Sequence, residues 1–332
     1  MKDAFSRNIN YLRISVTDRC NLRCVYCMPA EGVRWIPHSE ILSYEDILRV
    51  VEAAAELGVS KVRVTGGEPT VRAGIADFVR MLAQVPGLDD ISMTTNGIAL
   101  PRLAGPLKEA GLKRVNISLD TLKADRFKAI TRVGKLGDAL AGIRAAQEAG
   151  LSPVKVNVVA MQGVNDDEIA DLARLTLERE LHVRFIELMP FTDFHCSLGQ
   201  GEVRPAFLPT KRVMEEVEKA LGKLEVAKPP LGNGPARYYR VHGARGTVGF
   251  ISPFSQEHFC AGCNRLRLTS DGKLRPCLLN YQEADLRPAL RRGASREELQ
   301  RFVLEVVRSK PERHPPTPGQ GPHSRKMIQI GG

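Results

Sequence analysis

Short β-branched runs alternate with amphipathic stretches along the first two thirds of the chain. Apolar runs of five or six residues between turn signals indicate buried strands, and apolar residues spaced three and four apart indicate helices. The expected strands are 11–15, 61–65, 90–94, 114–118, 154–159 and 182–186. The expected helices are 44–57, 75–84, 103–110, 136–149 and 167–179.

This alternation predicts a parallel sheet with right-handed crossovers. Ser43 is expected to cap the first helix, and Gly58 and Gly111 are expected to end the first and third. Six strand–helix units are too few for a closed eight-stranded barrel. We therefore predict an α/β fold, an incomplete TIM-type barrel of about six βα units, with its chemistry at the carboxyl ends of the strands.

The pattern changes beyond residue 220. A Pro- and Gly-rich stretch, 228–235, indicates a linker or an exposed loop, and two strands are expected at 237–241 and 247–251. We expect a partial barrel over residues 1–225 and a smaller C-terminal domain over residues 226–332. Segment 191–209 matches no pattern, and Cys196 within it is expected to be a surface thiol.

Composition narrows the class of protein. Of 332 residues, 43% are apolar, but the chain has no apolar run long enough to span a membrane and no signal-peptide pattern. Seven cysteines without a secretion signal indicate a reducing, cytoplasmic location and metal ligation instead of disulfides. A net charge of +10 predicts an anionic partner, either a nucleic acid or a phosphorylated small molecule.

Cys20, Cys24 and Cys27 directly follow the first expected strand. A structural zinc usually takes four ligands in two pairs. Three thiolates within eight residues can instead hold three corners of a [4Fe–4S] cubane and leave one iron open. A zinc loop or reduced core cysteines are the alternatives. The spacing resembles the signature of the radical S-adenosylmethionine (SAM) superfamily, in which SAM chelates the open iron and is cleaved to a 5′-deoxyadenosyl radical.

Polar residues follow several other strands. The turn from Thr65 to Pro69 contains Gly66, Gly67 and Glu68, and it resembles the glycine-rich SAM-binding motif of that superfamily. Backbone carbonyls there, or Glu68, are candidates to receive an ammonium group, although a simple turn is the alternative. The hydroxyls of Thr94 and Ser118 are candidate ligand contacts or turn residues.

Two cations interrupt the apolar runs of the fifth and sixth strands, Lys155 and Arg184. A buried cation needs a partner, so a bound anion or a buried salt bridge is expected at each.

A second set of three cysteines, Cys260, Cys263 and Cys277, predicts a second [4Fe–4S] cluster. Zinc completed by His258 or water is the alternative. Arg265 and Arg267 follow on one face of a strand, where they form either a polyphosphate clamp or a solvated basic strand.

The chain ends in Gly331-Gly332. By composition this is a disordered tail, but glycines at a terminus could also thread into a narrow active site. A ubiquitin-like diglycine is a further, less favoured alternative.

Together these motifs resemble the GTP 3′,8-cyclase family of molybdenum cofactor biosynthesis over nearly the whole chain. The resemblance implies conversion of GTP to 3′,8-cyclo-7,8-dihydro-GTP, with SAM cleaved to 5′-deoxyadenosine and methionine and two [4Fe–4S] clusters as cofactors. The radical would take hydrogen from C3′ of the ribose, and that carbon would then attack C8 of the base. The implied partners are an electron donor and a downstream cyclic pyranopterin monophosphate synthase, with no nucleic acid or membrane. The chain would be a monomer or a homodimer.

The resemblance also implies residue roles. The first cysteine set would hold the catalytic cluster, and the second set would hold the cluster that binds guanine. The implied SAM contacts are Tyr26, Gly67, Ser118 and Met189. The implied GTP contacts are Arg13, Arg63, Thr94, Lys155, Arg265, Leu266, Arg267, Lys61 and Arg184. Gly331 and Gly332 would insert toward the active site. Thr70 and Val71 depart from the family pattern, in which a leucine-containing stretch is usual.

Two other functions remain possible from the sequence. A radical SAM enzyme acting on RNA or peptide would share the first cluster and use the basic charge, but it would lack the arginine pair beside a second cysteine set. A zinc-stabilised nucleic-acid-binding protein would not explain cysteines at the end of a barrel strand.

Overall fold

Eight parallel strands form the centre of the fold in the computed structural model of the chain. The structure describes residues 1–189, 196–198, 201–203, 206–232, 234–314 and 325–331. The first six pair in chain order and confirm the expected strands: β1 (Tyr11–Ser15), β2 (Lys61–Thr65), β3 (Asp90–Thr95), β4 (Arg114–Ser118), β5 (Val154–Gln162) and β6 (Leu181–Glu187). Two later strands complete the parallel part. β12 (Thr247–Ile251) pairs with β6, and β13 (Arg265–Leu268) pairs with β1.

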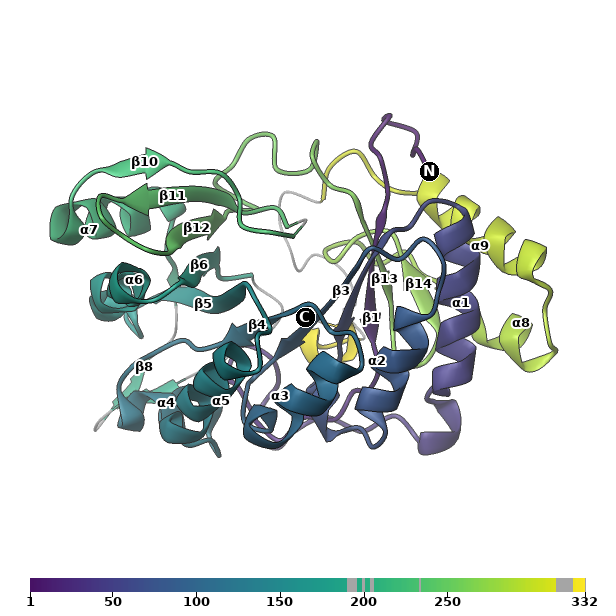
Figure 1. Ribbon diagram of the computed structural model, residues 1–332, viewed down its shortest axis with the longest axis horizontal. Coiled ribbons are helices and arrows are strands. Elements are labelled where there is room, and N and C mark those ends of the chain that lie inside the picture. Colours follow the sequence, from purple (N-terminus) through teal and green to yellow (C-terminus); the bar gives the residue numbers. More distant parts are fainter. Residues whose placement is uncertain (190–195, 199–200, 204–205, 233, 315–324, 332) are drawn as a thin grey trace.

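Antiparallel strands extend the sheet on both sides, and it does not close (Figure 1). β11 (Arg237–Val241) and β10 (Leu224–Val226) lie beyond β12, whereas β14 (Lys273–Arg275) and β15 (Ala284–Asp285) lie beyond β13. Two small pairings lie apart from this order, β9 (Ala206–Phe207) with β5, and β7 (Cys196–Leu198) with β8 (Gly201–Val203). The expected incomplete α/β barrel is thus confirmed, with both of its ends built from the C-terminal part of the chain.

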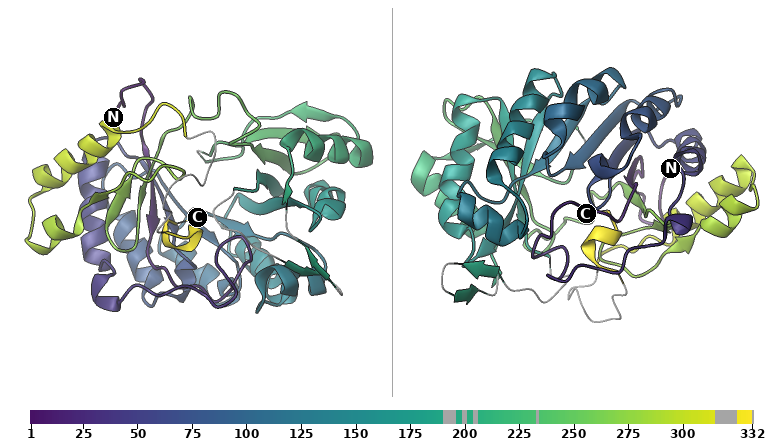
Figure 2. Two further views of the ribbon diagram at one scale, coloured as in Figure 1. Left: turned by 180° about the vertical axis from the view of Figure 1, so that it is seen from behind. Right: turned by 90° about the horizontal axis from the view of Figure 1, so that it is seen from below.

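Helices cover the outer face of the sheet (Figure 2). The crossover helices are α1 (Tyr44–Glu56), α2 (Ile75–Ala83), α3 (Leu100–Glu109), α4 (Ala124–Thr131), α5 (Leu136–Glu148) and α6 (Ile169–Glu178). The later helices are α7 (Thr210–Leu221), α8 (Arg287–Arg291) and α9 (Arg296–Arg308). None of the helices in the described residues is long and apolar enough to cross a membrane.

The expected helix ends are confirmed. Ser43 Oγ accepts a hydrogen bond from the backbone N–H of Asp46 at 3.0 Å. Gly58 and Gly111 have φ of 97° and 105°, a conformation that glycine adopts at little cost. The Pro- and Gly-rich stretch connects β10 to β11. The domain boundary expected after residue 225 falls inside β10, and its position stays a prediction.

The two faces of the sheet differ in polarity. On β1, Leu12 and Ile14 are fully buried in the core between the sheet and the helices. Arg13 between them faces the interior of the barrel, because successive strand residues point to opposite faces. The interior therefore receives polar side chains from strands whose outer face is apolar.

Candidate active site

A single cavity inside the barrel is lined by all six cysteines of the two predicted sets. The first set lies on the loop after β1. Arg23 Nη1 donates to the Cys20 carbonyl at 2.7 Å, and Arg132 Nη1 donates to the carbonyls of Arg23 and Met28 at 2.8 and 3.0 Å. Guanidinium groups thus fix the backbone of the loop while its thiols face the cavity.

Burial makes the thiols of the first set poor acids. Burial raises the pKa of Cys20 to about 11. Burial also raises the pKa of Cys24 and Cys27 far above the usual range, and the neighbouring thiols and Asp120 raise both further. Because metals bind the thiolate, this site needs a strongly cationic ligand such as iron to offset the buried charge.

The glycine-rich turn after β2 packs directly on the cysteine loop. Gly67 N–H donates to the Thr17 carbonyl at 2.7 Å, and Glu68 N–H donates to the Arg19 carbonyl at 2.8 Å. A Cβ at position 67 would lie 2.3 Å from the Arg19 carbonyl oxygen. The nearest neighbours of this glycine are therefore the backbone of the cysteine loop, and the turn fixes that loop as well as lining the cavity.

Glu68 is almost completely buried, and its carboxylate already has four hydrogen-bond donors. Oε1 accepts from Thr70 N–H at 3.1 Å, Thr70 Oγ1 at 2.6 Å and Thr95 Oγ1 at 2.7 Å. Oε2 accepts from Asn96 N–H at 2.6 Å. Glu68 thus joins the turns after β2 and β3, and it contributes negative charge to the same end of the cavity as the first cysteine set.

The second cysteine set has cationic surroundings. Arg265 Nη2 lies 3.7 Å from Cys263 Sγ. Although burial acts to raise the pKa of Cys263, the charges of Arg265 and Lys310 outweigh it and lower the pKa to about 6. A lowered pKa favours the thiolate, which is the form of cysteine that binds metals.

The number of thiols in each set suits an iron–sulfur cluster with one open iron. A zinc site brings its thiolates to about 2.3 Å from a single point. A [4Fe–4S] cubane spreads its cysteine ligands over separate irons. Two sets of three thiols around one cavity therefore fit clusters better than zinc.

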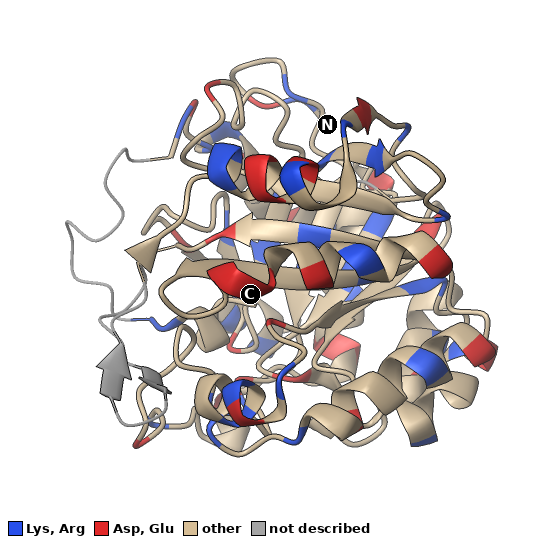
Figure 3. Cartoon of the chain, turned by 90° about the vertical axis from the view of Figure 1, so that its left-hand side faces the viewer, with Lys and Arg blue, Asp and Glu red and all other residues tan. Residues whose placement is uncertain are grey.

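Basic side chains from β1, β2, β6 and β13 project between the two cysteine sets. Lys and Arg occur on strands inside the fold as well as on its helices (Figure 3). Burial, with neighbouring cations, lowers the pKa of Arg63 to about 9 and that of Arg267 to about 10. Within the described residues, no carboxylate forms an ion pair with Arg63, Lys155, Arg184, Arg265 or Arg267. A bound polyanion would neutralise them.

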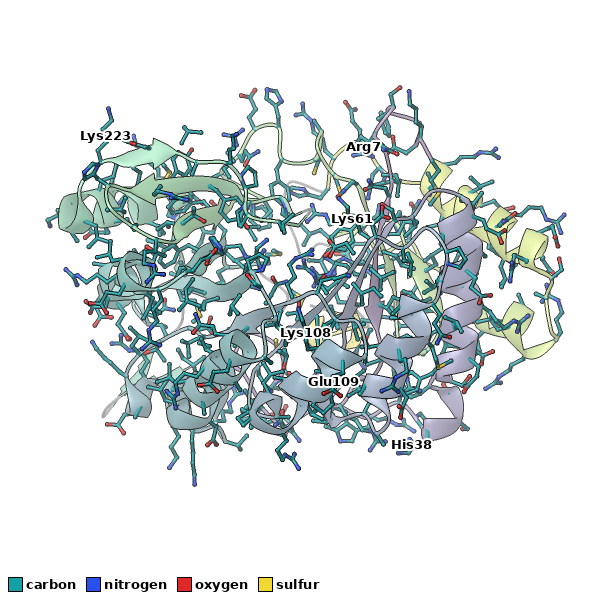
Figure 4. The ribbon with its side chains drawn as sticks, viewed as in Figure 1. Arg7, His38, Lys61, Lys108, Glu109 and Lys223 are labelled. Atoms are coloured by element: carbon teal, nitrogen blue, oxygen red, sulfur yellow. The ribbon has the colours of Figure 1, made fainter. Side chains whose placement is uncertain are left out.

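Most of the predicted ligand contacts meet at this cavity. Its lining includes the four predicted SAM contacts and the following predicted GTP contacts: Arg13, Arg63, Thr94, Arg184, Arg265 and Arg267. The side chain of Leu266 lies in the hydrophobic core on the opposite face of β13. Lys61 stands at the start of β2, below Arg7 in the view of Figure 4, and it does not line the cavity.

Lys155 is buried beside the cavity without lining it. Its Nζ donates to the Leu231 carbonyl at 2.6 Å, in the stretch between β10 and β11. Burial lowers the pKa of Lys155 to about 6, and Arg184, Arg114 and Arg63 lower it further. The hydrogen-bond partner of this amine is thus a neutral backbone carbonyl.

The C-terminal end of the chain lies near the middle of the molecule (Figures 1 and 2). Met327 and Ile328 of this segment line the cavity. The Gly331 carbonyl accepts hydrogen bonds from Arg267 Nη1 at 3.0 Å, Arg13 Nη2 at 3.3 Å and Thr65 Oγ1 at 3.4 Å. Gly331 has φ of 74°, and a Cβ there would lie 2.8 Å from Thr65 Oγ1, so both conformation and space require glycine. Gly332 lies outside the described residues.

The lining also includes polar residues to which sequence reasoning gave no role, among them Asp120, Asn157, Lys310 and His314. Asp120 accepts a hydrogen bond from Tyr26 OH at 2.7 Å, and its place directly after β4 was the available signal. Asn157 accepts from Arg184 Nε at 2.9 Å. Nothing in the local sequence around Lys310 and His314 indicates that they approach the second cysteine set.

Two family models match the chain. Radical SAM superfamily matches residues 14–176, and Molybdenum Cofactor Synthesis C matches residues 181–316. A solved structure, Streptococcus suis SuiB, has a similar fold with a TM-score of 0.59 at 15% identity, covering 92% of this chain and 66% of SuiB. Fold and cavity thus define a radical SAM protein.

Curated relatives narrow the class. The GTP 3′,8-cyclase of Pelotomaculum thermopropionicum is 54% identical over 332 residues, which is all of both chains. That of Desulforamulus reducens is 51% identical over the full length of both chains. The chain belongs to the GTP 3′,8-cyclase family.

Proposed function

We propose that the cavity binds SAM beside Cys20, Cys24 and Cys27 and binds GTP beside Cys260, Cys263 and Cys277. The chain is accordingly a lyase-type radical SAM enzyme that converts GTP to 3′,8-cyclo-7,8-dihydro-GTP in the first step of molybdenum cofactor biosynthesis. The observation that carries the assignment is that Arg63, Arg184, Arg265 and Arg267 line one cavity together with both cysteine sets. Among the residues that the structure describes, no carboxylate forms an ion pair with these four arginines.

Each cysteine set would hold one [4Fe–4S] cluster and leave one iron open. When bound, the first cluster and SAM supply the radical, and the second cluster supplies an iron for the guanine base. The protein fixes the first loop through Arg23, Arg132 and the glycine-rich turn. This rigidity serves orientation, because a radical must be formed within reach of the ribose hydrogen that it abstracts.

The cations orient the substrate. Arg265 and Arg267 lie on the same face of β13, next to Arg13 on β1, where Arg13 and Arg267 are register partners. Guanidinium groups pair with phosphate oxygens in a fixed planar geometry, which suits a triphosphate held at several points. Lys155 would exchange the Leu231 carbonyl for a phosphate oxygen.

The SAM contacts occupy the acidic end. Tyr26 and Ser118 stand near Asp120, while Gly67 and Met189 complete the lining. The negative charge of Glu68 and Asp120 suits a cofactor whose sulfonium and ammonium groups are both positive.

The partners and location belong to the same proposal. An electron donor reduces the first cluster, and a cyclic pyranopterin monophosphate synthase consumes the product. Thiols that serve as ligands in two oxygen-sensitive sites favour a reducing, cytoplasmic location. Arg63, Arg184, Arg265 and Arg267 line one internal cavity with Lys155 buried beside it, which favours a small anion over a nucleic acid.

The test is the iron and sulfide content of anaerobically purified protein, with EPR spectra of the reduced form with and without GTP. We expect about eight irons, four per cluster, and one cluster signal that changes on addition of GTP. About four irons with one zinc, or no response to GTP, would contradict the placement of substrate on the second cluster. Formation of 5′-deoxyadenosine and cyclised GTP by reduced enzyme then tests the reaction itself.

A further inference from the structure

The chain segment after α9 runs along the second cysteine set. Lys310 is only 3% exposed. Its Nζ donates to the Arg265 carbonyl at 2.9 Å and also donates to the Pro276 carbonyl. Arg265 follows Cys263 by two residues and Pro276 directly precedes Cys277, so one ammonium group fixes the backbone beside two of the three cysteines.

Arg7 fixes the third cysteine from the other end of the chain (Figure 4). Its Nη1 donates to the Cys260 carbonyl at 3.1 Å and to the Glu312 carbonyl at 2.9 Å. Its Nη2 donates to the Pro311 carbonyl at 2.7 Å, and its Nε is held by Asp3 Oδ2 at 2.6 Å. Residues 310–312 are thereby attached to the loop that carries Cys260.

His314 reaches the sulfur itself. Its Nδ1 lies 2.9 Å from Cys260 Sγ, and its ring packs edge-on against Phe254 with ring centroids 5.4 Å apart. A cysteine that ligates iron is a thiolate and can only accept a hydrogen bond. His314 Nδ1 must then carry a hydrogen atom and donate a hydrogen bond to that sulfur.

We infer that Lys310 and His314 are positioning residues of the second cluster. Lys310 holds the strands that present Cys263 and Cys277, and His314 donates a hydrogen bond to the coordinating sulfur of Cys260. Such a bond favours the more negative, reduced state of a cluster and so raises its reduction potential. This inference rests on the proposed role of the second cysteine set.

The hydrogen bond is tested with His314→Leu and His314→Asn in the full-length, anaerobically purified protein. Leucine fills similar space without a donor, whereas the asparagine amide can donate from nearly the same position. Redox titration followed by EPR should show a lower potential of the second cluster in His314→Leu and a value close to wild type in His314→Asn. The first cluster should titrate unchanged in both. Equal second-cluster potentials in wild type and His314→Leu would overturn the role of His314.

The role of Lys310 is tested with Lys310→Met, and Lys219→Met on the exposed face of α7 is the matched control. Lys310→Met should lose about half of its iron and the GTP-responsive signal, because about four of eight irons belong to each cluster. It should still cleave SAM, which also shows that the barrel has folded. Full iron content and an unchanged GTP response would overturn the role of Lys310. About four irons in the wild type would instead contradict the proposed function.

Discussion

The two cysteine sets line one cavity, yet their surroundings have opposite charge. Around the first set, burial and the carboxylates of Glu68 and Asp120 disfavour thiolates, and the pKa of Cys20 rises to about 11. In the second set, Arg265 and Lys310 favour a thiolate at Cys263, whose pKa falls to about 6 despite burial. Burial raises the pKa of Cys260 in the same set, so the contrast rests on Cys263.

In the proposed function, this difference would separate the two ligands of the reaction. A cofactor with two positive groups would be attracted to the acidic end, and a triphosphate would be attracted to the basic end. Because both ends belong to one cavity, the proposed placement orients the substrate toward the cofactor. The predictions below test that division, beginning with the largest expected effect.

Cys24→Ser and Cys263→Ser should have different effects on SAM cleavage, because each removes a ligand at a different end of the cavity. Cys24→Ser removes a ligand of the first set and should abolish SAM cleavage and cyclisation together. Cys263→Ser should abolish cyclisation while reduced enzyme still forms 5′-deoxyadenosine. Iron analysis measures the cluster content of each variant, and product chromatography measures 5′-deoxyadenosine and cyclised GTP. Cys196→Ser, at the sequence-predicted surface thiol, is the control and should keep full activity. Cyclisation by Cys263→Ser would contradict the division.

Arg265→Ala and Arg267→Ala should weaken GTP binding while leaving SAM cleavage largely intact. A hydrogen bond to a charged group contributes about 1.5–3 kcal/mol, so each variant should lose roughly 10- to 150-fold in affinity. Equilibrium binding to iron-loaded protein measures the loss, and Arg102→Ala on the exposed face of α3 is the control. Unchanged GTP affinity in both variants would contradict the proposal that Arg265 and Arg267 bind the triphosphate.

GTP binding should weaken as pH rises above about 6, the depressed pKa of Lys155. Between that pKa and the higher value expected beside phosphate, the free enzyme holds fewer protons than the complex, so binding takes up a proton. Calorimetry at pH 8 in buffers of different ionisation enthalpy should detect this uptake. Lys155→Met should bind GTP more weakly and lose that part of the uptake. Equal uptake in the variant would mean that another group titrates.

Gly331→Ala should have the smallest effect. The added Cβ would contact Thr65 Oγ1, and the left-handed conformation costs a non-glycine residue about 1–2 kcal/mol. We expect the tail to leave Arg13 and Arg267 more often and cyclisation to slow, while iron content stays constant. Gly105→Ala inside α3 meets no atom within 4 Å and is the control. Equal rates in both variants would show that the position of the tail has no influence on turnover.

Local sequence patterns predicted the elements well where periodicity is strong. The strands Tyr11–Ser15, Lys61–Thr65 and Arg114–Ser118 were predicted with their observed bounds, because β-branched runs end there at turn residues. Helices α7 and α9 are exceptions, because their buried apolar residues recur at helical spacing and yet neither helix was predicted. Helices α4 and α8 were not predicted either.

Long-range pairing was beyond local sequence reasoning. Nothing near Arg265 or Thr247 indicates that their strands join β1 and β6. The cysteine sets were predictable from spacing. The arginines proposed to contact GTP were predicted from a resemblance, and for Arg265 and Arg267 also from their place on one face of a strand. The surroundings of the second cysteine set were not predictable, because Arg7, Lys310 and His314 reach that set from distant parts of the chain.

The pairing of β1 with β13 also constrains the order in which the chain can fold. During synthesis, the outer edge of β1 has no partner until residues 265–268 have been made. An unpaired strand edge is a template for aggregation, and contacts so distant in sequence form slowly. The first cysteine loop directly follows that same strand. The sheet beside the first cysteine set is therefore complete only after residues 265–268 have been made and have paired with β1.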